Sequence, residues 1–239
     1  MLKYKILSGS SLKTIAMISM LVDHTSKCFW RYDQAMNLAY FHIGKIAITP
    51  MFILSAVIGR LAFPIFAFLI VEGYLHTRNS RRYAKNLLLF ALLSIIPWNL
   101  EHGHWLAIRG HNVMFTLFLG VVCIDSIAKY SKQKSSLIIL GSLLVSFIFS
   151  TDYGPAGIAL IITMYLLRER RFYQNLAMVP LFMPNKYTMS AMLASIPIMM
   201  YNGQRGFIKG NFGKYLMYLF YPLHLLILGL IKLFAQSPL

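Results

Sequence analysis

Long apolar runs, separated by short clusters of Lys and Arg, constrain the fold of this chain more than any other feature. A membrane core about 30 Å thick is crossed by roughly 20 apolar residues in helical form. Apolar residues make up 58% of the chain and charged residues only 13%, whereas soluble domains carry about a quarter charged residues. Since lipid offers no hydrogen bonds to an open backbone, such runs form helices. The sequence therefore predicts an all-α, polytopic integral membrane helical bundle. It excludes a soluble globular enzyme, a disordered tail and a secreted disulfide scaffold.

Nine apolar runs are candidate spans, and we expect about eight to ten transmembrane helices in a single domain over residues 1–239. The second run would reach about 46 Å as a straight helix, which exceeds one crossing. We therefore expect a separate short helix over 46–58, interfacial or re-entrant, before a span over about 59–77. The seventh and eighth runs are short and contain prolines, which is typical of tilted spans or of broken helices around a cavity. The nine runs are 11–30, 46–76, 86–100, 112–129, 136–150, 154–167, 173–184, 187–201 and 215–236.

The charge of the chain follows its expected topology. The 23 Lys and Arg residues outnumber 7 acids, and most of them fall in alternate connections between the runs. By the positive-inside rule, this alternation predicts a cytoplasmic N-terminus and an outside C-terminus. A nucleic-acid binder would carry its charge on a solvated face, so we expect no nucleic-acid partner. Cys28 and Cys123 both fall in apolar runs, which does not support a disulfide.

Ionisable groups inside spans are costly, and each is a functional hypothesis. His24 lies about 16 Å along the first helix from Lys13, and His224 lies about 14 Å from Tyr215 in the last helix. The matched depths predict two histidines facing one cavity, although hydrogen bonding between helices would also account for each. Asp23 points about 100° away from His24, so we expect Lys27, on its own face, or Arg60, across the bundle, as its partner.

Glu72 lies just inside the end of its span, where it is either a catalytic carboxylate or a partner for Arg78. Arg78 and Arg82 belong to basic connections that topology alone can explain. Alternatively, they bind a polyanion such as a nucleotide-bearing donor, because guanidinium groups pair with phosphates. No Walker A loop or GxGxxG is present, so the sequence does not support ATP-driven pumping or a Rossmann cofactor. The segment Glu101-His102-Gly103-His104, with His111, resembles a loose metal cluster but lacks a complete ligand shell, and we expect no metal.

Several segments, in order along nearly the whole chain, carry a resemblance to a known family. They are Leu12-Lys13-Thr14-Ile15-Ala16-Met17 leading to Asp23-His24; Gly59-Arg60-Leu61-Ala62-Phe63-Pro64-Ile65-Phe66-Ala67-Phe68 through Glu72-Gly73; Thr77-Arg78 with Tyr83; His111-Asn112-Val113 with Thr116 and Gly120; Asp152-Tyr153-Gly154; Tyr201-Asn202-Gly203-Gln204-Arg205-Gly206; and Tyr221-Pro222-Leu223-His224. Together they resemble the TraX family, named for a conjugal-transfer protein that N-acetylates pilin, and the segments 60–66 and 201–206 are the most specific. The family pattern has an acid after the serine of the third span, whereas this chain reads Ser94-Ile95-Ile96-Pro97.

The resemblance implies a multi-pass acyltransferase of the bacterial inner membrane that takes acetyl-CoA as donor. It implies His24 as the catalytic residue, either a general base or an acyl carrier, with Asp23 tuning it or anchoring its helix. Glu72 would be a further catalytic carboxylate that lines the path. The acceptor would be an amine or hydroxyl: a pilin or peptide N-terminus, a glycan or a lipid. The groups that would bind the donor or line its path are Arg60, Arg78, Arg82, Asn112, Asn202, Arg205 and His224.

Two other classes of protein fit the same residues. In a proton-coupled transporter, Asp23, Glu72 and the two histidines would form a relay. In a non-catalytic assembly subunit, these groups would be dispensable. Turnover of a thioester would distinguish an acyltransferase from both of these classes.

Overall fold

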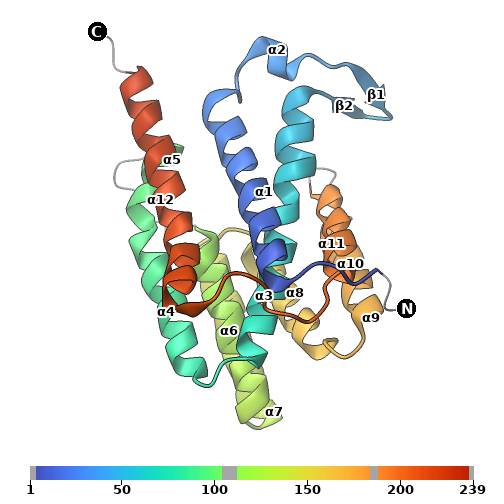
Figure 1. The fold of residues 1–239 in the computed structure, drawn as a ribbon, viewed down its shortest axis with the longest axis vertical. Coiled ribbons are helices and arrows are strands. Elements are labelled where there is room, and N and C mark those ends of the chain that lie inside the picture. The colour runs from blue at the N-terminus through green and yellow to red at the C-terminus, as the bar shows by residue number, and fades with distance from the viewer. Residues whose placement is uncertain (1–3, 104–111, 184–187, 237–239) are drawn as a thin grey trace.

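The computed structural model describes residues 4–103, 112–183 and 188–236, and confirms an all-α membrane helical bundle with one small β-hairpin (Figure 1). Its elements, in chain order, are α1 Gly9–Phe29, α2 Gln34–Asn37, β1 Phe41–Ile43, β2 Ile46–Ile48, the π-helix η1 Phe52–Ile58, the 3₁₀ segment η2 Gly59–Leu61, α3 Ala62–Leu75, α4 Ser80–Leu93, α5 Ile95–His102, α6 Val113–Lys129, α7 Lys132–Ile148, α8 Gly154–Leu166, α9 Arg171–Leu176, α10 Met178–Phe182, the 3₁₀ segment η3 Met189–Ala194, α11 Ser195–Met199 and α12 Gly210–Gln236.

Each predicted apolar run contains helix. Among the described residues, three helices are both long and apolar enough to cross a membrane: Phe52–Leu75, Ser80–His102 and Tyr215–Ala235. Shorter apolar helices pack around them. The two proline-containing runs are broken into short pieces, α9 with α10 and η3 with α11. Of the two predicted forms, tilted spans or broken helices, the structure therefore has broken helices.

The prediction of a separate helix over 46–58 is wrong. Residues Ile46–Ile48 form strand β2, and one continuous helix then runs from Phe52 through η1, η2 and α3 to Leu75. The hairpin takes up the excess length, and the remaining helix of 24 residues is within the length that can cross a membrane. Where the helix changes type, the Ser19 hydroxyl of α1 donates to the carbonyls of Ile58 (2.5 Å) and Gly59 (3.2 Å), which fixes this point of the helix against α1.

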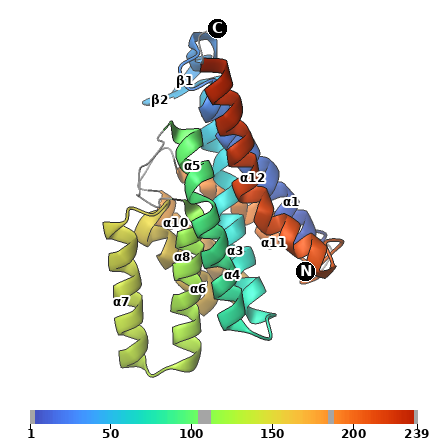
Figure 2. The same ribbon diagram turned by 90° about the vertical axis from the view of Figure 1, so that its left-hand side faces the viewer.

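The helices form a staggered bundle. In Figures 1 and 2, the hairpin lies at the same end of the molecule as the last turns of α1 and α12, whereas α7 extends to the opposite end. The core between the helices holds fully buried side chains such as Leu12, Ile65, Phe68 and Ile161. The outer face of α7 instead exposes large apolar side chains, for example Leu137 at 70%. This distribution is that of a bundle whose outer surface contacts lipid.

Candidate functional site

The structure brings the two histidines together. The rings of His24, from α1, and His224, from α12, lie 5.2 Å apart between centroids, with one ring edge against the face of the other. His224 is buried, and its Nδ1 lies 2.8 Å from the carbonyl oxygen of Phe220, one turn earlier in α12. Because a carbonyl only accepts, Nδ1 carries the proton and Nε2 is a free acceptor. No hydrogen-bond partner for this Nε2 is found among the described residues.

A buried carboxylate completes this cluster. Glu101, in the last turn of α5, is 4% exposed, and its Oε1 lies 3.8 Å from Nδ1 of His24. Its Oε2 lies 2.6 Å from Nδ1 of His102. Gly229 allows α12 to approach α5 closely, since a Cβ there would lie 2.9 Å from the backbone nitrogen of Glu101. Three helices therefore meet at this point.

The position of Glu101 beside His24 was not predicted from the sequence. It placed Glu101 in a loose metal cluster, of which His104 and His111 lie outside the described residues. Among the residues that the structure describes, no group of three or more His, Cys, Asp or Glu could hold a metal ion. The burial of Glu101 follows from the length of α5, which continues two residues beyond the apolar run, to His102. An acid that directly follows an apolar run was the sequence feature that could have indicated this.

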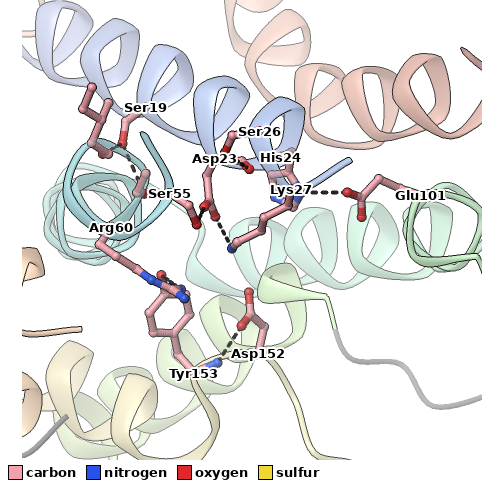
Figure 3. A network of polar contacts seen from close by, with 12 residues as sticks. Ser19, Asp23, His24, Ser26, Lys27, Ser55, Arg60, Glu101, Asp152 and Tyr153 are labelled. Carbon is pink, nitrogen blue, oxygen red and sulfur yellow. Dashed lines mark hydrogen bonds and ion pairs between the residues drawn. The ribbon is translucent and has the colours of Figure 1, made fainter. Parts of the chain in front are cut away.

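Asp23 makes its contacts on the other side of α1 (Figure 3). Its carboxylate pairs with Lys27, one turn later (2.6 Å), as the helical spacing predicted. It also accepts from the Ser55 hydroxyl of η1 (2.8 Å). A Cβ on Gly59 would lie 2.5 Å from the Asp23 Cβ, so α1 and η2 pack closely here. These contacts favour the anchoring role for Asp23.

Arg60 extends the polar network towards the turn before α8 (Figure 3). Its Nη1 lies 3.4 Å from the Tyr153 hydroxyl, and the Tyr153 ring stacks on Phe63 at 3.8 Å. Tyr153 has a φ of +60°, which is unfavourable for a bulky residue. The hydroxyl of Thr116, which bonds the carbonyl of Asp152, helps to hold this turn in place.

A cavity of about 440 Å³ lies between α1, α3, α6 and α12. Its lining includes Phe220 and Tyr221, whose rings lie 4.9 and 5.6 Å from the ring of His224. Towards the start of α1 the lining carries charged side chains, including Lys13 and Arg205, and between the two ends it is apolar, with Met17 among its residues. The cavity therefore extends from a basic mouth, defined here by Lys13 and Arg205, to two aromatic side chains that contact His224, although neither His24 nor His224 lines it.

Glu72 also lines the cavity, but far from His24. It follows Gly59, which contacts Asp23, by 13 residues of helix, or about 20 Å. Its ion-pair partner is Arg171 of α9 at 3.7 Å, not Arg78 as one of the two hypotheses proposed. The Arg171 guanidinium lies over the ring of Tyr201 at 4.9 Å.

The remaining predicted residues lie in three kinds of place. Arg78 and Arg82 are exposed at the turn into α4, outside the cavity lining. Asn202 caps its own loop, where its Oδ1 accepts from the Gln204 nitrogen (2.9 Å). Asn112 is fully buried: its Oδ1 caps α6 and its Nδ2 donates to the carbonyl of Ala91 (2.9 Å).

The fold and the site define a polytopic helical membrane protein in which a cavity extends from a basic mouth to aromatic side chains that pack against His224, itself in ring contact with His24. The chain belongs to the TraX family, since the family model described as TraX protein matches residues 8–232. It is 24% identical to the probable fimbrial assembly protein FimC, serogroup H1, of Dichelobacter nodosus, and the alignment covers 96% of this chain and 97% of that protein. No solved structure matches the chain.

Proposed function

We propose that this protein is an acyltransferase of the bacterial inner membrane, which transfers an acetyl group from acetyl-CoA to an amine or hydroxyl acceptor. The observation that carries the proposal is the cavity that extends from Lys13 and Arg205 to Phe220 and Tyr221, the two residues that pack against His224 of the histidine pair. A transfer across the membrane requires a donor site open to the cytosol and a reactive group at depth. With the N-terminus in the cytoplasm, the basic mouth faces the cytosol.

The cavity suits a long donor with a charged head. Lysine and arginine at the mouth would hold the phosphates of coenzyme A, and Arg78 and Arg82 on the adjacent surface would add to this attraction. The apolar middle would take the pantetheine arm, and the thioester would then reach Phe220 and Tyr221 beside the histidines. The volume of about 440 Å³ falls within the range of ordinary ligand sites.

The chemistry needs one base and no redox step. In the simplest form, the acceptor lone pair attacks the thioester carbonyl while His24 takes the acceptor proton. The carbon–sulfur bond then breaks, and the leaving thiolate recovers the proton from the imidazolium. The products are the acetylated acceptor and free coenzyme A. If His24 instead carries the acyl group, its imidazole nitrogen first attacks the thioester carbonyl and coenzyme A leaves as the thiolate. The acceptor then attacks the acyl-imidazole, the imidazole leaves, and the acceptor proton passes to the thiolate.

The acceptor class follows from the relatives rather than from the cavity. The similar protein from Dichelobacter nodosus is named a probable fimbrial assembly protein, and the family resemblance of the sequence implies pilin acetylation. Both favour a pilin-related acceptor, such as a pilin N-terminus, that approaches from the side opposite the basic mouth. A surface glycan or lipid would react by the same route.

The test is release of free thiol from acetyl-CoA by the purified protein in lipid, with and without membrane extract as acceptor. We expect turnover by the wild type and a loss of at least about 100-fold in His24→Ala, which removes the base. Asp125→Asn is a matched control, because Asp125 pairs with Lys129 (2.7 Å) away from the histidine pair. No thiol release by folded wild-type protein with any acceptor would favour the proton-coupled transporter instead.

A further inference from the structure

We propose that Glu101 is a positioning residue for His24: it accepts the Nδ1–H of this imidazole and so leaves Nε2 as the free base. The inference rests on the acyltransferase function proposed above, and assigns a role to a buried acid outside the cavity lining. It also selects His24, rather than His224, as the ring that takes up a proton.

The geometry directs one imidazole nitrogen towards the carboxylate. The nitrogen of His24 nearest to Glu101 is Nδ1, at 3.8 Å from Oε1 (Figure 3). A carboxylate is an acceptor only, so this arrangement favours the tautomer with the proton on Nδ1. The distance exceeds a hydrogen bond, but catalytic contacts often tighten only when substrate is bound. Glu101 comes from α5 and His24 from α1, so the contact also depends on the packing of two helices.

The burial of Glu101 indicates that its carboxylate is paired with a positive charge. An ionised carboxylate in an apolar bundle is costly unless it is paired. Both ion-pair contacts of this carboxylate among the described residues come from histidines, His24 and His102. Lys232 lies close by, but donates to the backbone carbonyl of Glu101 (3.0 Å). A proton on an imidazole is therefore the charge that this carboxylate is placed to stabilise.

His224 lacks such a partner. Its Nδ1 lies against the Phe220 carbonyl, and Phe220 and Tyr221 pack against its ring. No ion pair with an acid is found for His224 among the described residues, whereas His24 has one with Glu101. When a proton enters the pair, the carboxylate stabilises it on His24. The two rings in contact thus have different roles: His24 takes the proton from the acceptor, and His224 stays neutral beside it.

The test compares three substitutions at Glu101. Glu101→Gln keeps the shape and an acceptor oxygen but removes the charge, and we expect kcat for thiol release to fall about 10- to 100-fold with KM for acetyl-CoA within twofold. Glu101→Met removes the acceptor as well, and should lower kcat further. Glu101→Asp restores a carboxylate and should recover at least part of the loss relative to Gln. Gel filtration and thermal unfolding in lipid or detergent confirm that each variant is folded.

A second readout does not need activity. In ¹⁵N-histidine-labelled protein without substrate, with His24 assigned by comparison with His24→Ala, we expect the Nδ1–H tautomer in the wild type and a mixture of tautomers in Glu101→Met. If the wild type releases no thiol, the proposed function fails, and this spectrum still decides the role of Glu101.

Three results would each overturn the inference. The first is normal kcat in Glu101→Gln, and the second is an unchanged His24 tautomer in Glu101→Met. The third is the same loss of kcat in His102→Gln, because Glu101 would then act by holding His102 and the end of α5. Asp125→Asn controls for the loss of a membrane-protein carboxylate as such, and should leave both kcat and the spectrum unchanged.

Discussion

At the residue scale, the contact between Gly59 and Asp23 sets how closely α1 and η2 pack. A Cβ at Gly59 would overlap the Asp23 side chain at 2.5–2.7 Å. We expect Gly59→Ala to destabilise the protein by about 1–3 kcal/mol through overpacking, seen as a lower apparent Tm in lipid. Gly141→Ala is the matched control, because nothing lies within 4 Å of its Cβ position on α7. Equal Tm values for the two variants would contradict this packing.

A substitution at Asn112 distinguishes a structural role for this residue from a role in binding the acyl donor. Its two side-chain bonds cap α6 and link it to α4. We therefore expect Asn112→Ala to lower stability by roughly 1–3 kcal/mol, since the cap is lost and a buried carbonyl is left unpaired. In the protein that remains folded, KM for acetyl-CoA should be unchanged. A raised KM at normal stability would instead support the donor-binding role that the family resemblance implied.

At the element scale, the π-helix η1 fixes which side of the helix carries Ser55. A π turn places the side chains that precede it about one residue out of α-helical phase, and such turns often lie at functional sites. Deleting Val57 should return this turn to α-helix and rotate Ser55 away from Asp23. We expect a lower Tm and reduced thiol release from the deletion, whereas Val57→Ala, which keeps the phase, should leave activity near the wild-type level. Full activity in the deletion would show that the phase is unimportant.

The elements also show how far the sequence predicts this structure. The apolar runs identify the helices because lipid-facing and core-facing surfaces are both apolar, and the depths of His24 and His224 follow from helical rise alone. The π-helix η1 and the hairpin of β1 and β2 were not predicted, since a hydropathy pattern does not report which backbone hydrogen bonds form. Glu101 joins His24, and Arg171 joins Glu72, only through packing between helices distant in sequence.

At the scale of the whole molecule, the proposed donor route has a basic end. If Lys13 and Arg205 hold phosphates, Lys13→Gln and Arg205→Gln should each raise KM for acetyl-CoA about tenfold, from the loss of about 1.5 kcal/mol per charged hydrogen bond, with little change in kcat. Lys45→Gln, an exposed site in the hairpin turn at the far end, is the control. Equal effects of all three substitutions would mean that overall charge, not the mouth, attracts the donor.

In the proposed mechanism, the acyl donor binds in one cavity, from which its thioester reaches His24. The most direct measurement is calorimetric binding of coenzyme A, together with thiol release from acetyl-CoA, in Met17→Trp, His24→Ala and Ile18→Trp. Met17 lines the cavity, whereas the neighbouring Ile18 is 57% exposed on the outer face of α1. We predict that Met17→Trp loses both binding and turnover, that His24→Ala binds normally without turnover, and that Ile18→Trp behaves as the wild type. Normal binding and turnover in Met17→Trp would show that the donor does not bind in this cavity.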